Sequence, residues 1–423
     1  MNAIEIRQRF TELRQLIQAK DLSRATRRVL DFFTDFYLPA ELKRNAISLR
    51  AAYNEWVRSG PEENLAEQEN ALLQQCAQLL DAIELELETP ENVPVHKDAH
   101  GLFRAAEKVE GVQVVVEATG ITKTFRTPLH TFRLPPLDIS LKVGEIPGVV
   151  GENGNGKTTL LRMVAGDLQA DGGELGYPGF DVPEGDWYQI KQHIAFIPQA
   201  LSPWQGYLKE NLHFTAAIHG IKGQANEDRV EFIIHRLGLT RYSDSLWKEI
   251  SSGYKLRFEL ARALVWKPQL LIIDEPLANL DINTQQMFLQ DLRYLADSLT
   301  EPIAILLTSQ HLHEVESIAD NIIFMREGRA LYNGSMQEFG QNRKENLFEV
   351  VADVSASEIQ DVLKDLNGLE IEDQGRITLV RVAADVPPAQ VLGALAQAGI
   401  SPQYFRDIST STLKLFREHA QKD

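Results

Sequence analysis

The sequence contains Gly151-Glu152-Asn153-Gly154-Asn155-Gly156-Lys157-Thr158, which matches the pattern G-x-x-x-x-G-K-[ST]. A β-branched run at residues 146–150 leads into it, and a helical pattern follows from Thr159. In such a strand–loop–helix setting, glycines let backbone N–H groups surround phosphate oxygens, and the helix N-terminus favours the same negative charge. A glycine-rich turn with an exposed lysine is the alternative, but it would not require the flanking strand and helix. We therefore predict that residues 151–159 bind the phosphates of a nucleotide.

Two side chains of this loop have specific expected roles. Lys157 would neutralise charge on the β- and γ-phosphates. In this position it would also assist catalysis. The Thr158 hydroxyl would bind Mg²⁺, because this ion prefers hard oxygen ligands together with phosphate oxygens. These features are shared by kinases, GTPases and ATPases, so the loop does not choose among them.

A short apolar strand that ends in two carboxylates narrows the choice. Residues 270–273 are Leu-Leu-Ile-Ile, and Asp274 and Glu275 follow them directly. Asp274 can hold the Mg²⁺ shell at the end of the strand, and Glu275 can polarise an attacking water as a general base. A core strand that ends in surface acids is common in isolation. Its combination with the phosphate loop favours an ATP-hydrolysing site.

The segment between these motifs, residues 250–264, reads Ile-Ser-Ser-Gly-Tyr-Lys-Leu-Arg-Phe-Glu-Leu-Ala-Arg-Ala-Leu. It resembles the signature of ATP-binding-cassette (ABC) ATPases, which is usually L-S-G-G-Q followed by a helix that ends A-R-A-L. The resemblance implies a head-to-tail dimer in which Ser251 and Gly253 of one subunit contact the γ-phosphate held by the other. An anion site at a helix N-terminus agrees with this role. Ser252 and Tyr254 depart from the usual glycine and glutamine, and we expect altered rate with retained activity.

Three further residues match motifs of that family. Gln199, which follows an apolar strand, matches the glutamine that contacts Mg²⁺ or water, although a solvated polar residue is an equal alternative. Phe125 matches the aromatic residue that stacks on adenine, and a buried core phenylalanine is the alternative. Asp281 matches the loop that couples the two sites of the dimer. It can also cap the helix that follows, and both roles are compatible.

The position after the next strand departs from the family pattern. The family usually has histidine there, whereas the alignment of residues 305–316 places Gln310 in that slot and His311 one residue late. Some drug-exporter cassettes of the family look similar in this respect. A glutamine can donate a hydrogen bond to the γ-phosphate but cannot become cationic. We therefore expect hydrolysis to survive and to be slower than in a histidine enzyme.

Changes in periodicity divide the chain into four segments. Residues 1–90 show four amphipathic helical patterns and predict a small helical bundle. Residues 91–111 lose periodicity and are interpreted as a linker. Residues 112–340 alternate short strands with helices, which predicts an α/β ABC ATPase domain with a mostly parallel sheet and a helical signature subdomain. Residues 341–423 show the order β-α-β-β-α-β and predict a ferredoxin-like α+β domain.

The two outer segments carry weaker resemblances. The last 80 residues, including 404–411, resemble the small domain that ends many ABC-2-type exporter ATPases, which implies regulation or dimer support. A passive appendage is the alternative. Residues 45–54 and 67–73 of the helical bundle look like a helical effector-associated adaptor domain, a type that pairs with like domains on other proteins. The alternative is an accessory segment that packs on the ATPase and binds no partner.

Composition limits the classes of function. The chain has 423 residues, with 60 acidic and 43 basic side chains and a formal net charge of −17. This balance argues against general nucleic-acid binding, which needs a basic surface. The single cysteine, Cys76, excludes an intrachain disulfide and a cysteine metal cage, and fits a cytoplasmic location. The apolar runs are of strand length, so a transport path would come from another chain.

Two hypotheses for function follow. The first is the ATP-binding and hydrolysing subunit of an ABC-type exporter, which pairs with a second ABC subunit, expected as a homodimer, and drives a separate polytopic membrane permease. It would use ATP and Mg²⁺ and lie at the inner face of the cell membrane. The second is an ATP-controlled dimer switch without transport, which presents its N-terminal segments to helical adaptor-domain proteins. The transported substrate is not specified by the sequence.

Overall fold

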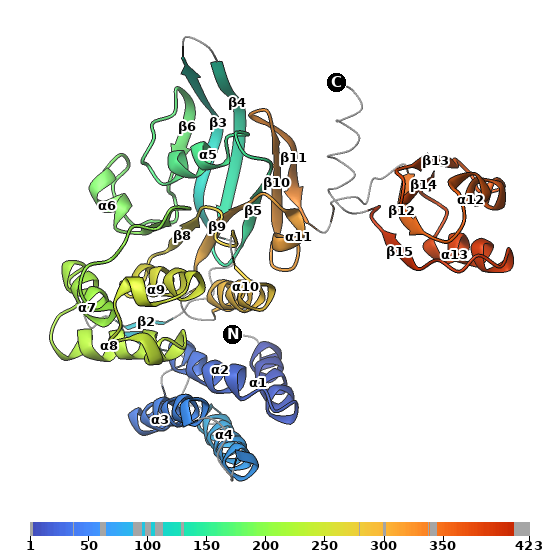
Figure 1. Ribbon diagram of the computed structural model, residues 1–423. Helices are drawn as coiled ribbons and strands as arrows, with labels where there is room; N and C mark the ends of the chain where they lie inside the picture. The colour runs from blue at the N-terminus through green and yellow to red at the C-terminus, as the bar shows by residue number, and fades with distance from the viewer. Residues whose placement is uncertain are drawn as a thin grey trace. The chain divides into compact units, whose positions relative to one another are not determined.

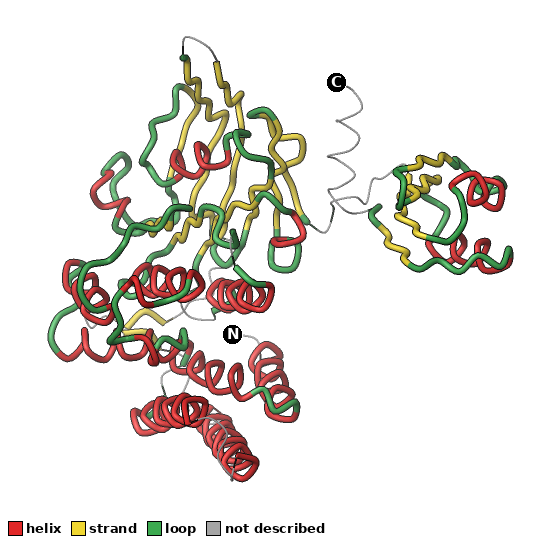
Figure 2. Tube along the Cα trace, viewed as in Figure 1, coloured by secondary structure: helices red, strands yellow, loops and turns green. Residues whose placement is uncertain are grey.

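The computed structural model describes residues 3–36, 38–59, 65–87, 95–97, 103–105, 113–127, 131–278, 280–298, 302–336, 338 and 345–409. They form two compact units, Met1–Asn333 and Gly334–Asp423. Figure 1 labels the elements along the chain, and Figure 2 separates helices from strands. The first unit therefore contains both the predicted helical bundle and the predicted ATPase domain. None of the described helices combines the length and the apolar character needed to cross a membrane.

The first unit begins with four helices, as the apolar spacing predicts. They are α1 (Ala3–Gln18), α2 (Leu22–Asp35), α3 (Ala40–Ser59) and α4 (Leu65–Leu87). Their apolar faces meet in a small core, in which the rings of Phe10 and Phe32 have centroids 4.8 Å apart and Ile83 is fully buried. The carboxylate of Asp21 accepts the Arg24 N–H at 3.1 Å and fixes the start of α2.

Part of the segment predicted as a linker has regular structure. Strands β1 (Val95–Lys97) and β2 (Phe103–Ala105) pair antiparallel with each other. The other residues of the segment 91–111 lie outside the described ranges. The absence of periodicity was a poor guide here, because three-residue strands are too short to show an alternating pattern.

A six-stranded sheet is the centre of the ATPase part, and its strand order is β11-β10-β5-β9-β8-β7. The strands are β5 (Pro147–Val150), β7 (Ile194–Ile197), β8 (Leu270–Ile273), β9 (Ala304–Ser309), β10 (Asn321–Arg326) and β11 (Arg329–Ser335). The five strands from β10 to β7 are parallel. They are short apolar runs because both faces of the sheet are covered. The predicted mostly parallel sheet is confirmed.

A second, antiparallel sheet shares the same hydrophobic core. It has the order β4-β3-β6, with β3 (Val114–Arg126), β4 (Thr131–Lys142) and β6 (Gly172–Gly176). Helix α5 (Lys157–Val164) contributes Leu160 to this core, alongside Ile121 from β3 and Leu306 from β9. The core therefore holds α5, and with it the phosphate loop, rigidly between the two sheets.

The chain between β7 and β8 forms a helical block. Its helices are α7 (Leu208–Ile218), α8 (Gln224–Arg236) and α9 (Ser252–Leu264), with 3-10 turns at Thr240–Tyr242 and Trp247–Glu249. Because β7 and β8 are paired neighbours, the whole block is an insertion between two adjacent strands. Other short or flanking helices are α6 (Trp187–Lys191), α10 (Ile282–Ala296) and α11 (Leu312–Val315).

The second unit has the predicted ferredoxin-like order. Its elements are β12 (Glu345–Val351), α12 (Ala356–Leu363), β13 (Glu370–Asp373), β14 (Thr378–Ala383), α13 (Pro388–Gln397) and β15 (Tyr404–Asp407). The antiparallel sheet runs β13-β14-β12-β15, and Ser355 and Glu358 form a capping box at the start of α12. The residues after Ser409, which belong to the predicted segment 341–423, lie outside the described residues.

Candidate functional site

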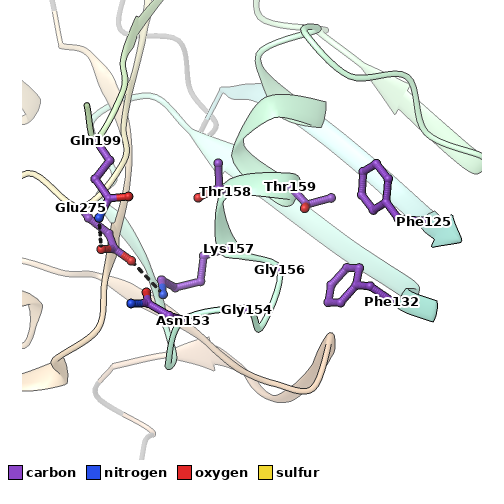
Figure 3. Close-up of a pocket in the computed structure, with 10 residues that line it drawn as sticks. All are labelled: Phe125, Phe132, Asn153, Gly154, Gly156, Lys157, Thr158, Thr159, Gln199 and Glu275. Atoms are coloured by element: carbon purple, nitrogen blue, oxygen red, sulfur yellow. Dashed lines mark hydrogen bonds and ion pairs between the residues drawn. The ribbon is translucent and has the colours of Figure 1, made fainter. Parts of the chain in front are cut away.

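A cleft of about 430 Å³ opens beside the phosphate loop (Figure 3). It is lined by ten residues: Phe125, Phe132, Asn153, Gly154, Gly156, Lys157, Thr158, Thr159, Gln199 and Glu275. The polar members come from the carboxyl ends of neighbouring parallel strands, which is where ligands bind in open α/β sheets. The strand order therefore brings together motifs that are far apart in the sequence.

The phosphate loop is shaped by glycines that other residues could not replace. Gly156 has φ +95°, and a Cβ there would lie 2.6 Å from Cζ of Phe132. At Gly151 a Cβ would lie 2.3 Å from the carbonyl oxygen of Met325. The Asn155 side chain accepts the Glu327 N–H at 2.8 Å and ties the loop to the turn after β10. Glu152, Asn153 and Gly154 are the exposed residues of the loop before Asn155, and Asn153 and Gly154 face the cleft.

Lys157 is the first residue of α5, and it is nearly inaccessible to solvent. Its Nζ donates to the carbonyl oxygen of Gly151 at 2.7 Å and to that of Glu152 at 3.2 Å. It also forms an ion pair with Oε1 of Glu275 at 3.0 Å. The lysine predicted to meet phosphate is thus held inside its own loop and against the predicted general base.

Glu275 is the centre of the polar contacts in the cleft. Its Oε2 accepts hydrogen bonds from Nε2 of Gln199 and from Nε2 of Gln310, each at 2.7 Å. Its backbone has φ +46°, a left-handed conformation that non-glycine residues rarely adopt. The Glu275 N–H donates to the Thr308 hydroxyl at 2.8 Å, which helps hold this conformation. Figure 3 shows Gln199 and Lys157 approaching the carboxylate from different sides.

Asp274 lies next to this carboxylate but has different partners. The Thr158 hydroxyl donates to its Oδ2 and the Thr308 hydroxyl donates to its Oδ1, both at 2.7 Å. Asp274 is 3% exposed, whereas Thr158 faces solvent. Two hard oxygen groups from β8 and α5 therefore lie together at the open end of the phosphate loop.

The other end of the cleft is aromatic. Phe125 on β3 is 41% exposed, so the alternative of a buried core residue is wrong. It pairs across the hairpin with Phe132 on β4, and the two rings have centroids 6.3 Å apart. Figure 3 shows both rings beyond Thr159, away from Glu275. The cleft therefore has an apolar wall at one end and charged side chains at the other, with the phosphate loop between them.

The signature residues do not line this cleft. Ser251 is the exposed N-cap residue of α9, and a Cβ at Gly253 would lie 2.8 Å from Cγ2 of Thr284. Asp281 caps α10 through Thr284, whose N–H it accepts at 2.9 Å and whose hydroxyl it accepts at 2.6 Å. These hydrogen bonds from Thr284 lower the pKa of Asp281. The starts of α9 and α10 thus touch, and the capping role of Asp281 is confirmed.

Two residues of the site were given no role in the sequence analysis. Phe132 faces Phe125, and the only signal for it is its position opposite Phe125 in a β-hairpin. Thr308 is a fully buried hydroxyl at the end of an otherwise apolar strand, in contact with both Asp274 and Glu275. A polar residue in such a strand is a usable signal, because a buried hydroxyl needs hydrogen-bond partners. His311, by contrast, is the exposed N-cap residue that precedes α11.

A solved structure with a related arrangement is that of CbiO1 from Clostridium perfringens, described as part of the ABC transporter complex CbiONQ. The two chains share 22% sequence identity with a TM-score of 0.48, over 60% of this chain and 96% of that one.

Sequence comparisons give the family. A family model described as ABC transporter matches residues 134–278. The ABC transporter ATP-binding protein NatA of Bacillus subtilis is 30% identical over 215 residues, which are 50% of this chain and 86% of NatA. The daunorubicin/doxorubicin resistance ATP-binding protein DrrA of Streptomyces peucetius is 30% identical over 286 residues, which are 67% of this chain and 84% of DrrA. With its phosphate loop, acidic strand end and signature in the expected order, this chain belongs to the ATP-binding proteins of ABC transporters.

Proposed function

We propose that this ABC ATPase is the energy-supplying subunit of an exporter and that it works as a head-to-tail dimer on a separate membrane permease. The observation that carries the proposal is the Glu275 carboxylate, which Lys157, Gln199 and Gln310 surround in the cleft. This grouping of a carboxylate, a cation and two amide donors would suit a γ-phosphate and an attacking water. The name of the Nod factor export ATP-binding protein I of Burkholderia orbicola supports export.

In the proposed reaction, Glu275 accepts a proton from a water whose oxygen attacks the γ-phosphorus. The bond between that phosphorus and the β–γ bridging oxygen breaks, and ADP and phosphate leave. Lys157 exchanges its contact with Glu275 for the β- and γ-phosphate oxygens. Gln310 and Gln199, which already lie at the carboxylate, donate hydrogen bonds to the water or the γ-phosphate.

Mg²⁺ fits the oxygens at the open end of the phosphate loop. The Thr158 hydroxyl and an Asp274 carboxylate oxygen lie 2.7 Å apart, and such hard oxygens are the ligands that Mg²⁺ prefers. When bound, Mg²⁺ would neutralise phosphate charge. Thr308 would keep Asp274 oriented through its hydrogen bond to the second carboxylate oxygen.

The nucleotide site becomes complete only with a second subunit in this proposal. Ser251 is exposed at the start of α9 and lies outside the cleft of its own chain. A helix N-terminus with an exposed hydroxyl suits the γ-phosphate of a facing subunit. The capped start of α10 at Asp281 is in contact with the same region and would meet the partner too.

For the permease we propose the surface of α7. Phe214 and Ile218, four residues apart on this helix, are 65% and 62% exposed, and Tyr207 just before it is 51% exposed. This apolar surface begins eight residues after Gln199 in the sequence, so residues 199–207 would connect a docked partner to the cleft. It would place the protein peripherally, at the inner face of the cell membrane.

The switch hypothesis has less support. The relatives found by sequence are ATP-binding proteins of transporters. The N-terminal bundle is engaged with its own ATPase through buried ion pairs such as Arg236 with Asp31 at 2.7 Å. Pairing of the bundle with adaptor-domain proteins is therefore not favoured.

Two experiments test the proposal. Light scattering of the Glu275→Gln protein with ATP should show a stable dimer, because hydrolysis is blocked while binding remains. The matched Ser251→Arg/Glu275→Gln protein should bind ATP and stay monomeric, since Ser251 is exposed and lies outside its own cleft. Affinity purification of Glu275→Gln protein from detergent-solubilised native membranes should recover a polytopic partner, and Phe214→Asp should reduce its yield. A persistent Glu275→Gln monomer, or the recovery of soluble partners alone, would contradict the proposal.

A further inference from the structure

Helix α2 links two separate parts of the ATPase through a chain of buried ion pairs. Arg236, at the end of α8, donates from Nε to Oδ1 of Asp31 at 2.7 Å. Arg28 donates to the other oxygen of Asp31 at 2.9 Å and to Oδ1 of Asp291 in α10 at 2.8 Å. Arg27 also donates to Asp291, at 3.2 Å. One helical turn of the bundle therefore joins the helical block to α10.

The contact with α10 continues on both sides of this chain. The Arg28 guanidinium lies 3.3 Å above the centre of the Tyr294 ring, and the Tyr294 hydroxyl donates to Glu12 of α1. The Ser298 hydroxyl donates to Asp35 at 2.5 Å, and Asp35 is paired with Arg9. The bundle is thus fixed along the second half of α10.

The charged side chains in these contacts are buried, so their pairing affects both their pKa values and the stability of the interface. The side chains of Arg28, Asp31 and Asp291 are 9%, 8% and 5% exposed. Burial alone would raise the pKa of Asp31, but Arg236 and Arg28 outweigh it and lower that pKa. A buried charge without its partner is strongly unfavourable, so the five side chains of this ion-pair chain, Arg27, Arg28, Asp31, Arg236 and Asp291, are held as a set. Replacing one of these side chains while the bundle stays docked would leave its partner buried and unpaired.

At Arg236, the end of the ion-pair chain that lies in α8, the structure continues to the signature residues at the start of α9. Tyr242, in the 3-10 turn six residues after Arg236, packs on Tyr254 of α9 with ring centroids 4.2 Å apart. Tyr254 is the residue that replaces the usual glutamine of the signature. At the other end of the chain, α10 starts at Asp281 and meets Gly253 through Thr284. Both surfaces that would face a second subunit are therefore connected to α2.

We propose that the N-terminal bundle is a brace and that Arg28 is its positioning residue. By bridging Asp31 to Asp291, Arg28 holds the helical block against α10, so that the start of α9 and the start of α10 form one prearranged surface for the second ABC subunit. This inference rests on the head-to-tail dimer of the proposed function. The bundle would then strengthen ATP-driven dimerisation without touching the nucleotide.

The first test measures dimerisation and nucleotide binding separately in full-length Glu275→Gln protein. Arg28→Gln should weaken the ATP-driven dimer at least tenfold by sedimentation, with the affinity of the single chain for a fluorescent ATP analogue unchanged within twofold. Arg14→Gln is the matched control, because Arg14 is half-exposed and pairs only with Asp81 and Glu84 of the bundle among the described residues. Arg28→Lys, which keeps the charge but not the two-pronged contact, should fall between. Equal dimer affinity in the Arg28 and Arg14 variants would overturn the brace.

The second test does not depend on dimer formation. Hydrogen exchange of the nucleotide-free chain should be faster in residues 252–264 of the Arg28→Lys variant than in those of the Arg14→Gln variant. Faster exchange confined to residues 3–59 would show a merely local role and overturn the inference. If Glu275→Gln alone stays monomeric while exchange in α9 does respond to Arg28→Lys, the dimer of the proposed function fails and the positioning of α9 by the bundle stands.

Discussion

Lys157 and Glu275 form an ion pair of 3.0 Å between side chains that are 4% and 6% exposed. In the proposed mechanism, the cation that contacts phosphate and the base that activates water are therefore paired with each other. Binding of ATP must separate them, and a buried ion pair is strongly coupled because solvent screens it little. We therefore expect a γ-phosphate to compete with Glu275 for Lys157.

Replacing this carboxylate should change binding as well as hydrolysis. Glu275→Gln removes the charge that holds Lys157, so we expect ATP affinity to rise roughly 3- to 10-fold. This change corresponds to part of the free energy of one charged hydrogen bond. Hydrolysis should fall by about 100-fold or more, since a general base is lost. Titration with a fluorescent ATP analogue and a phosphate-release assay measure the two effects. Glu184→Gln, in an exposed loop, is the control. Weaker ATP binding by Glu275→Gln would show that the pair does not oppose nucleotide.

Gln310 should control the rate of hydrolysis. Its amide reaches Glu275 at 2.7 Å, so Gln310→Ala removes one donor from the reacting groups and should slow phosphate release roughly 10- to 100-fold. Gln310→His restores the residue usual in the family and should hydrolyse faster than the native chain. His311→Ala serves as the neighbouring control and should stay within twofold. An unchanged rate in Gln310→Ala would remove Gln310 from the mechanism.

The aromatic wall should contribute to nucleotide affinity. Stacking of a base on an aromatic ring contributes about 1–3 kcal/mol, so Phe125→Ala should weaken ATP binding roughly 10-fold. Phe132→Ala should have a similar effect, because its ring also packs beside Gly156 and supports the loop. Inorganic triphosphate, which has no base, should bind Phe125→Ala as well as it binds the native chain. Equal loss for triphosphate and ATP would mean that Phe125 supports the loop and not the base.

Thr308 should act through its two acidic neighbours. Thr308→Val keeps the shape of the side chain but removes the hydroxyl that donates to Asp274 and accepts from Glu275. We expect the Mg²⁺ concentration for half-maximal ATPase activity to rise several-fold and the maximal rate to fall about 10-fold. A change of this size corresponds to the loss of about one or two buried hydrogen bonds. A Mg²⁺ titration of the rate separates these effects. An identical titration for both proteins would show that Thr308 only fills space.

Stability should fall in mild acid because of His235. Burial, with smaller contributions from Arg50 and Lys209, lowers the pKa of His235 to about 4 from an ordinary value of 6.5. Between these values the unfolded chain takes up a proton that the folded chain excludes, so stability is lost as pH falls from 6.5 towards 4. The loss from this group is about 3 kcal/mol.

Urea unfolding as a function of pH checks this expectation. His235→Asn, which retains a polar contact for Thr240, should flatten the decline between pH 6.5 and 4. The exposed residue His219 provides the control, and His219→Asn should leave the slope as it is. If the free energy of unfolding of the His235→Asn protein falls with pH as steeply as that of the native protein, His235 is not the cause of the decline.

Much of the fold and of the nucleotide cleft could be predicted because the signals are local. The glycines and Lys157 of the phosphate loop, and the apolar strand before Asp274, are contiguous patterns that impose one conformation. Strand order then brings their ends together without further information. The meeting of Gln310 with Glu275 follows in the same way, since β8 and β9 are neighbours.

The docking of the bundle could not be predicted in this way. Arg27, Arg28 and Asp31 occupy the polar side of an amphipathic helix, a pattern that usually marks a solvent-exposed face. Their partners Arg236 and Asp291 are more than 200 residues away and carry no matching signal. Buried ion pairs depend on three-dimensional proximity, and helical periodicity gives no information about which charged faces will meet.

The shared guanidinium of Arg28 also has an evolutionary consequence. Asp31 belongs to the bundle, and Asp291 to the ATPase, so Arg28 needs both segments to be correct at once. A gene fusion that joined this bundle to a cassette without Arg236 and Asp291 would bury three charges against apolar or mismatched neighbours. The bundle and its cassette should therefore be inherited together, and a functional chimera would require transplanting those two cassette positions along with the helices.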